Sequence, residues 1–378
     1  MMRNFFTGCV AGVLLASCTQ SPLFGPIANQ VANPINVAVD STRNRAYVVN
    51  SDDEFLYTQG SLHVVDLSTI TAPTLVQSKT MDSFGAQILL DTTTQNAYIT
   101  NRLSASDEVT TDHLLQVNID ATSANFLTVG STSTGSNPFG LLRLPGTNRA
   151  VIVTRDGFLT VFDISGATPS QLFQVDLHRT LSNGGELTAV SAVEVAVVGP
   201  FLAITRIGGG ILLVNISELG NSAVNPVDYF LEDVLDPRGI SAVGNILYVA
   251  DVDGANNYLR IFDLATLAAD TANTTTTVVA AGSAQLQASV VVGVNPQEVL
   301  VGTTNVFVGN ADDGTVSVVN QSSRAVTTTI TVGEQPFGMN FYYLGGSATE
   351  THLLVCNRRG NSVSIIDLSN NTIVGTYQ

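Results

Sequence analysis

The sequence is short of the residues that most metal, haem and hydrolase sites require. Its 378 residues include three cysteines, four histidines and no tryptophan. The histidines are spread along the chain and form no His-x-His, His-Glu-x-x-His or Cys-x-x-Cys-His pattern. A Gly-x-Ser-x-Gly nucleophile elbow is absent, and the glycine run at 208–210 opens no helix that would make a phosphate loop. None of these catalytic or cofactor-binding motifs is therefore present.

Thiols and lysine side chains are also scarce. After residue 18 the only cysteine is Cys356, so this part of the chain cannot close an internal disulfide. Cys356 lies in an apolar run, which predicts a small buried side chain. The only lysine is Lys79, and the formal net charge is −16. Such a charge argues against nucleic acid and anionic lipid headgroups as partners.

What the chain does have is one pattern repeated seven times, in units of about 40–60 residues. Each unit opens with a turn, and the turns fall at Pro34, Ser83, Pro138, Ala192, Pro237, Pro296 and Pro336. An extended run follows, covering residues 46–50, 97–101, 150–154, 202–206, 247–251, 306–310 and 353–357. A second extended run ends at Asp66, Asn118, Asp163, Asn215, Asp263, Asn320 or Asp367.

These runs are rich in Val, Ile, Leu, Thr, Tyr and Phe, and Gly, Asn, Asp, Ser and Pro bound them, as is typical of strands. A period of this length that contains only extended segments indicates a propeller rather than a helical solenoid. We therefore predict an all-β fold, a seven-bladed β-propeller of mostly four-stranded antiparallel blades.

The Asp or Asn that ends each second run predicts turn chemistry rather than catalysis. These side chains accept hydrogen bonds from backbone amides two residues on, and so start a turn. A turn at this place joins the third strand of a blade to its outermost strand. The opening prolines are interpreted as structural too, because proline fixes the chain where no ladder donor is needed.

Several of these runs resemble the YVTN-type β-propeller repeat family. The resemblance lies in residues 46–50 and 97–101, in the Val-Gly-x-x-Pro stretches at 292–296 and 332–336, and in runs such as 363–367. It is weakest in units three and four, where Thr154 and Arg206 replace Asn. The resemblance implies the fold. Because members of the family include surface-layer-like, periplasmic and redox-associated proteins, it carries over no functional residue.

The N-terminus predicts export. Arg3 precedes an apolar stretch, residues 5–16, that is too short for a membrane-spanning helix. The stretch ends in Leu-Ala-Ser-Cys18, which resembles a bacterial lipoprotein signal. That resemblance implies cleavage before Cys18 and diacylglyceryl transfer to its thiol. Thr19, in place of Asp, implies outer-membrane sorting in a host with two membranes.

We therefore divide the chain into a lipoprotein signal peptide (1–17), a lipidated cysteine with a tether (18–32) and a single propeller domain (33–378). The alternative is an ordinary secretory signal that contains a cysteine. Residues 373–377 can supply the outer strand of the last unit, so the ring can close without the N-terminus. A strand at residues 27–31, added to the outer edge there, would hold the ring shut.

Function is expected on the top face, the face that carries the loops between second and third strands and the connections between blades. Two of these loops, 51–61 and 102–113, are long, 252–258 is intermediate, and the segments 177–186 and 269–288 also end there.

Arginines gather on the same face. The candidate ligand-binding residues are Arg102, Arg155, Arg206, Arg238, Arg358 and Arg359. Guanidinium groups around a channel mouth suit a carboxylate, a phosphate or an acidic sugar. The alternative is that they pair with acids of the long loops: Asp52, Asp53, Glu54, Asp107, Glu108 and Asp112.

No cofactor is predicted, apart from a weak calcium hypothesis. Asp251, Asp253 and Asn256 place oxygen ligands in one short segment, but no glutamate follows at the EF-hand spacing.

The leading hypothesis is a lipid-anchored binding or scaffold module of the bacterial cell envelope, monomeric or part of a complex. Its partner is expected to be an envelope protein or glycan, and its membrane contact to be the N-terminal lipid alone. One rival is a propeller enzyme, lactonase-like or redox-associated, with Arg155, Arg206 and His178 at the channel mouth. The other is an accessory subunit of a redox complex.

Overall fold

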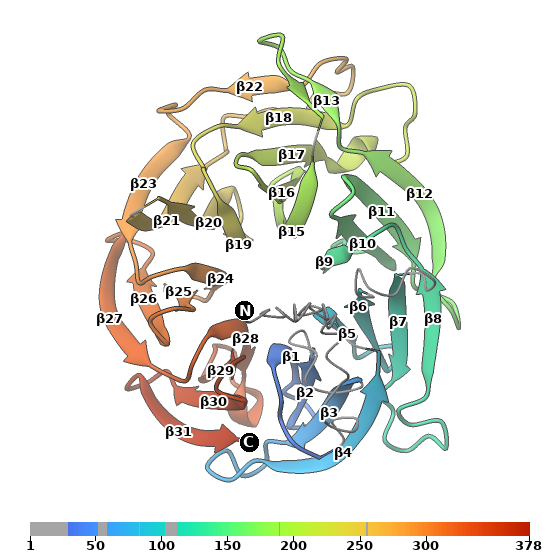
Figure 1. Ribbon diagram of the computed structural model, residues 1–378, viewed down its shortest axis with the longest axis vertical. Helices are drawn as coiled ribbons and strands as arrows, with labels where there is room; N and C mark the ends of the chain where they lie inside the picture. The colour runs from blue at the N-terminus through green and yellow to red at the C-terminus, as the bar shows by residue number, and fades with distance from the viewer. Residues whose placement is uncertain (1–28, 52–58, 83, 103–111, 189, 255) are drawn as a thin grey trace, which may run out of the picture.

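The computed structural model describes residues 29–51, 59–82, 84–102, 112–188, 190–254 and 256–378. In this part of the chain, seven blades stand around one axis, and each has four antiparallel strands, as predicted (Figure 1). The four antiparallel strands of each blade follow one another along the chain, interrupted only in blade 5, where β22 lies between the third and fourth strands. Two short 3-10 helices, η1 (Ile216–Glu218) and η2 (Leu344–Gly346), complete the elements.

The strands are named by their rank from the axis outward. The innermost are β1 (Pro34–Asp40), β5 (Gly85–Asp91), β9 (Pro138–Arg143), β15 (Ser191–Val198), β19 (Pro237–Val243), β24 (Pro296–Val301) and β28 (Pro336–Tyr342). The second are β2 (Arg45–Asn50), β6 (Asn96–Asn101), β10 (Arg149–Thr154), β16 (Phe201–Ile207), β20 (Ile246–Asp253), β25 (Asn305–Asn310) and β29 (His352–Asn357).

The third strands are β3 (Gly60–Asp66), β7 (His113–Asn118), β11 (Phe158–Asp163), β17 (Ile211–Asn215), β21 (Asn256–Asp263), β26 (Thr315–Asn320) and β30 (Ser362–Asp367). The outermost are β4 (Thr74–Met81), β8 (Val129–Ser133), β12 (Ser170–Asp176), β18 (Val227–Leu231), β23 (Leu286–Val291), β27 (Ala325–Thr331) and β31 (Thr372–Tyr377).

The predicted register holds around the ring. In the six blades whose predicted turn residue is described, this residue pairs with the last residue of the extended run predicted after it, for example Pro34 with Asn50 and Pro336 with Asn357. In blade 2 the opening residue is Gly85, which pairs with Asn101, whereas the predicted turn residue Ser83 lies outside the described residues. Buried aliphatic and aromatic side chains fill the space between blades.

All seven predicted turns at the ends of the third strands are present. In each, the Asp or Asn side chain accepts a hydrogen bond of 2.8–3.1 Å from the backbone amide two residues on. The acceptors are Asp66, Asn118, Asp163, Asn215, Asp263, Asn320 and Asp367. The repeated carboxylates and amides are thus turn residues.

The ring closes without strand exchange, because β31 completes blade 7 from its own stretch of chain. Contacts between side chains join blades 7 and 1 instead. The Tyr342 hydroxyl donates to Asn44 Oδ1 at 2.6 Å, and His63 Nδ1 lies 2.9 Å from the Tyr377 hydroxyl.

Two excursions depart from the regular blades, and both lie over blade 4 (Figure 1). Between blades 3 and 4 the chain forms the hairpin β13 (Arg179–Thr180) and β14 (Glu186–Leu187). Residues 269–288 were predicted to join two blades, but they connect β21 to β23 within blade 5. Part of this connection, β22 (Thr277–Val279), pairs in parallel with β18 as a fifth strand of blade 4. The prediction failed because only pairing, not local sequence, distinguishes β22 from β23.

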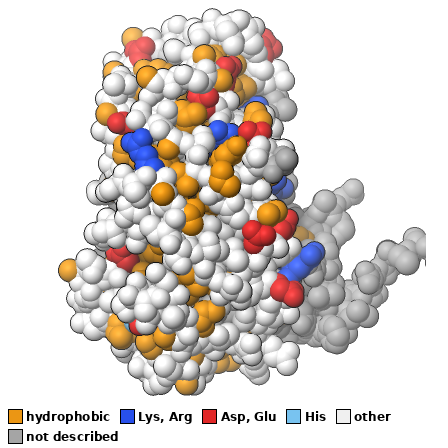
Figure 2. Space-filling view, turned by 90° about the vertical axis from the view of Figure 1, so that its left-hand side faces the viewer, with side chains coloured by type: hydrophobic (Ala, Val, Ile, Leu, Met, Phe, Trp, Pro, Cys, Tyr) orange, Lys and Arg blue, Asp and Glu red, His pale blue; other side chains and the backbone are white. Residues whose placement is uncertain are grey.

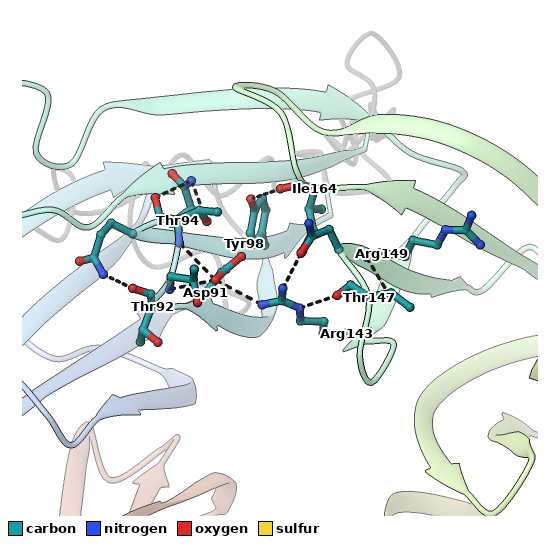
Figure 3. Close-up of polar contacts among 12 residues, drawn as sticks. Asp91, Thr92, Thr94, Tyr98, Arg143, Thr147, Arg149 and Ile164 are labelled. Carbon is teal, nitrogen blue, oxygen red and sulfur yellow. Dashed lines mark hydrogen bonds and ion pairs between the residues drawn. The ribbon is translucent and has the colours of Figure 1, made fainter.

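On the bottom face, polar contacts tie blade 2 to blade 3 (Figure 3). The Arg143 guanidinium lies 3.2 Å from the Asp91 carboxylate and also donates to the Thr147 carbonyl at 3.0 Å. Burial would raise the pKa of Asp91, but hydrogen bonds from the Thr94 and Thr93 amides, with the charge of Arg143, hold it below its usual range. The rim of the ring shown in Figure 2 bears few charged side chains, scattered among uncharged ones.

Candidate functional site

The positions of the candidate arginines follow from where the strands begin and end. Arg102, Arg155 and Arg358 come directly after second strands, where the chain reaches the top face. Arg206 lies near the end of β16, and Arg238 is the second residue of β19. All are therefore placed at the top face near the inner strands.

Two of these arginines join two phenylalanines in an alternating series across blades 2 and 3. The Arg102 guanidinium carbon lies 5.8 Å from the Phe84 ring centroid and 4.5 Å from that of Phe139. The Arg155 guanidinium carbon lies 4.8 Å from the same Phe139 ring. We call Phe84, Arg102, Phe139 and Arg155 the arginine–phenylalanine stack. A cation on an aromatic face is stabilised by about 0.5–2 kcal/mol, so the rings fix both guanidinium groups.

The backbone at Phe84 supports this view of the stack. Phe84 has φ 65°, a left-handed conformation that asparagine occupies at the corresponding place in other blades: Asn33, Asn137 and Asn295. Bulky residues rarely adopt it, and such backbone strain is concentrated at functional sites.

Arg155 carries a charge that no acid in the described chain neutralises. Its guanidinium makes no hydrogen bond or ion pair with any described residue, and its Nε is buried. The adjacent Asp156 instead accepts from the Ser136 amide at 3.2 Å and contacts the Thr154 hydroxyl. Burial and then the charge of Arg238 lower the pKa of Arg155. Arg155 therefore adds to the stack a positive charge that no described carboxylate neutralises.

The other predicted arginines are engaged elsewhere. Arg238 pairs with Asp236 at 2.6 Å. Arg206 donates to the carbonyl oxygens of Gly208 and Gly209, in the turn of its own hairpin.

Arg358 and Arg359 lie on the side of blades 6 and 7. Arg358 donates to Gln335 at 3.3 Å, and Arg359 lines a cleft of about 590 Å³ with Asp312, Asp313 and Glu334. Of the six predicted arginines, the structure thus brings together Arg102 and Arg155, with Arg238 within electrostatic reach.

The predicted calcium segment is a strand hairpin with an internal counter-ion. β20 and β21 pair as far as Asp253 and Asn256, so the predicted loop at 252–258 is mostly strand. Arg260 contacts both carboxylates, Asp251 at 2.9 Å and Asp253 at 3.1 Å. Asp251 also accepts two backbone amides. Within the described ranges, no three His, Cys, Asp or Glu side chains are grouped to hold a metal ion.

His178, the histidine of the rival enzyme hypothesis, lies beside blade 3. Its Nδ1 is 2.6 Å from Asp176 Oδ1, and its ring meets the Phe158 ring edge-on. A Cβ at Gly157 would lie 2.5 Å from its Cε1, so the imidazole packs on this backbone. Neither contact presents the histidine to a nucleophile.

Several predicted features lie outside the described residues. They are the signal segment with Cys18, most of the loops 51–61 and 102–113, and all the loop acids except Asp112. Asp112 Oδ2 accepts from the Asn137 amide at 2.5 Å. Among the described residues, no helix is long and apolar enough to cross a bilayer.

Sequence reasoning missed the two phenylalanines of the stack. Phe139 directly follows an opening proline, and Phe84 directly precedes an opening glycine. Aligning these two places across the seven units would have shown aromatic residues next to the arginines of blades 2 and 3.

Comparisons with known proteins support the fold. No protein-family model and no curated protein matches the chain. The hydrazine synthase structure from Kuenenia stuttgartiensis is similar, with a TM-score of 0.65 and 12% identity over 91% of this chain and 97% of that chain. The propeller domain of Cps50 (Swd1) from Myceliophteria thermophila has a TM-score of 0.62 and 9% identity over 90% and 99%. The computationally designed protein Ika8 has a TM-score of 0.57 and 14% identity over 94% and 90%. At these identities the likeness establishes the propeller fold alone.

Proposed function

We propose that this propeller is a binding module of the bacterial cell envelope that takes an acidic ligand on its top face. The observation that carries the proposal is Arg155, whose guanidinium lies on Phe139 without a carboxylate partner in the described chain. A guanidinium in such a place recognises a carboxylate or phosphate through two parallel hydrogen bonds. The ligand class is therefore an acidic glycan or the acidic segment of an envelope protein.

The anchoring half of the proposal rests on the sequence around Cys18. Acyl chains on Cys18 would hold the propeller at the membrane, since each buried CH₂ contributes about 0.8 kcal/mol. The unmodified protein is expected to incorporate labelled palmitate and to be found in the membrane fraction. The Cys18→Ser protein is expected to incorporate none. Equal labelling of the two proteins would refute lipidation at Cys18.

Ligand binding is tested with the full-length protein and two acidic probes, inorganic phosphate and oligogalacturonate, in isothermal titration calorimetry. Arg155→Ala is expected to weaken binding about tenfold or more, because a charge-assisted hydrogen bond contributes about 1.5–3 kcal/mol. Arg155→Lys should recover only part of the affinity, since an ammonium lacks the planar fork.

The matched control is Arg324→Ala, which removes an exposed arginine from the turn between β26 and β27 on the opposite face. Its affinity is expected to equal that of the unmodified protein. Equal losses in Arg155→Ala and Arg324→Ala, or no binding of either probe, would overturn the acidic-ligand proposal.

A further inference from the structure

A second cluster of polar side chains lies at the centre of the ring, on the innermost strands. Its members come from one aligned position of the innermost strands, which is the third residue in six blades and Glu194 in blade 4, and which is polar in four blades and glycine in three. The residues in blade order are Asn36, Gln87, Gly140, Glu194, Gly239, Glu298 and Gly338. A Cβ at Gly239 would lie 2.6 Å from the Glu298 Cα, and one at Gly338 would lie 2.6 Å from the Asn36 Cα. The glycines therefore let the strands approach closely, and four blades supply the polar groups.

Three of the polar side chains form a hydrogen-bonded chain. Asn36 Nδ2 donates to Gln87 Oε1 at 2.7 Å, and Gln87 Nε2 donates to Glu194 Oε1 at 2.7 Å. The second bond joins blade 2 to blade 4 past blade 3, where the corresponding residue is Gly140. It fixes one oxygen of the Glu194 carboxyl group toward an amide.

Glu298 brings a second carboxyl group to the same place. The charge of Glu194 acts on Glu298, and Glu298 in turn acts on the buried Cys356 thiol. Within the described residues its carboxyl group makes no hydrogen bond to another side chain, and only the Val299 amide offers one. Around this cluster, blades 3, 5 and 7 present glycine, so no cation from these positions offsets the two carboxyl groups.

The two carboxyl groups hold their protons more tightly than glutamates in water. Burial raises the pKa of Glu194 to about 7, although the Gln87 hydrogen bond opposes the rise. Burial, and then the charge of Glu194, raises the pKa of Glu298 well above its ordinary value. Both effects follow from placing two partly buried acids near each other at the centre of the ring.

We propose that Asn36, Gln87, Glu194 and Glu298 form a proton-dependent clamp at the centre of the ring. Its hydrogen bonds tie blades 1, 2 and 4 together, and with both carboxyl groups neutral Glu298 of blade 6 adds no charge repulsion. Loss of the protons above neutral pH sets two like charges against each other where the glycines of blades 3, 5 and 7 supply no cation, and the ring loses stability. This inference is independent of the acidic-ligand proposal, because none of the four residues belongs to the arginine–phenylalanine stack.

The sign of the pH effect follows from the raised pKa values. A carboxyl group whose pKa is higher in the folded state stabilises the fold below its unfolded pKa, and that stability is lost as the pH rises through the folded pKa. The test measures thermal unfolding of the full-length protein between pH 6.5 and 9. His63 titrates in the unfolded chain at the lower end of this window, but it does so equally in the unmodified protein and in each variant, so the difference between their pH profiles isolates the glutamates.

Across this window the Tm of the unmodified protein is expected to fall by about 2–4 °C, because the charge cost reduces the free energy of unfolding. Glu298→Gln mimics the protonated acid. Its Tm should match that of the unmodified protein at pH 6.5 and exceed it at pH 9. Glu334→Gln, which changes an exposed glutamate on the top face, is the matched control and should leave the pH profile unchanged.

A second measurement uses only the unmodified protein, so it does not require that a variant folds. The infrared spectrum of the unmodified protein at pH 7 is expected to contain the carbonyl band of a protonated carboxylic acid, which disappears as the pH is raised. Absence of this band at pH 7, or identical pH profiles for Glu298→Gln and Glu334→Gln, would overturn the clamp.

Discussion

Two seven-membered sets of residues run around the ring, and they follow opposite rules. The residues that end the third strands are all Asp or Asn, and each accepts the same bond from an amide two residues on. The aligned central residues on the innermost strands are of four types, and their hydrogen bonds join blades 1, 2 and 4. Each blade forms this turn from its own residues, so the same residue type is repeated in every blade. The centre is shared, so its polar groups are distributed over different blades.

If contacts between segments far apart in the sequence hold the ring together, the largest effect is expected where blades 7 and 1 meet. His63 is fully buried there, and burial lowers its pKa to about 4. A histidine with a lowered folded pKa stabilises the protein above its unfolded pKa of about 6.5, and that stability is lost as the pH falls toward 4. The loss is about 3 kcal/mol, at about 1.4 kcal/mol for each pKa unit.

Urea unfolding at pH 7 and pH 4 measures this loss. His63→Gln should remove this part of the pH dependence, whereas Tyr377→Phe should retain it, because the imidazole stays buried. A His63→Gln protein with the unmodified protein's pH dependence would show that the contact between blades 7 and 1 does not carry it.

The next largest effect is expected at Asn357, which combines local and distant bonds. Its amide donates to Ser362 and Ser364 at 3.1 and 2.9 Å, and its Oδ1 accepts from the Gly333 amide at 3.0 Å. Asn357→Ala leaves these buried groups unpaired and should reduce the free energy of unfolding by about 2–3 kcal/mol. Ser364→Ala, which removes one of the three bonds, should cost less in the same urea measurement. Equal losses would show that the amide is not the centre of the network.

Close approach of the innermost strands makes Gly239 the third test. An added Cβ would meet the backbone of Glu298 and Gln297 at 2.6 and 2.7 Å. Gly239→Ala should therefore destabilise the fold by about 2 kcal/mol through overpacking. Gly130→Ala in β8 is the control, because its Cβ would meet no atom within 4 Å. Similar thermal stability of the two variants would mean that the central strands have room to separate.

These differences explain how far the sequence predicts the molecule. The strand register and the seven turns could be predicted because each depends on residues within one unit. The bond from Gln87 to Glu194 spans 107 positions, so no local pattern reveals it. The connection at 269–288 was placed wrongly for the same reason, since β22 pairs with another blade. Arginines were predicted at the top face, but sequence alone did not show which of them lack a carboxylate.

The smallest effect is expected at one of the repeated turns, where the contact is local. The Asn320 side chain accepts from the Ser322 and Ser323 amides at 3.1 and 2.9 Å. Asn320→Ala removes the acceptor and should reduce the free energy of unfolding by about 1 kcal/mol. Asn320→Asp should be close to neutral, because Asp makes this bond at Asp163 and Asp263. If Asp cost as much as Ala in urea unfolding, the repeated position would select for the amide rather than for an acceptor. The turns were distinguished from the centre because each turn requires only a side-chain oxygen that accepts a local hydrogen bond, so that Asp and Asn are interchangeable between blades. A large cost of Asn320→Asp would contradict that requirement.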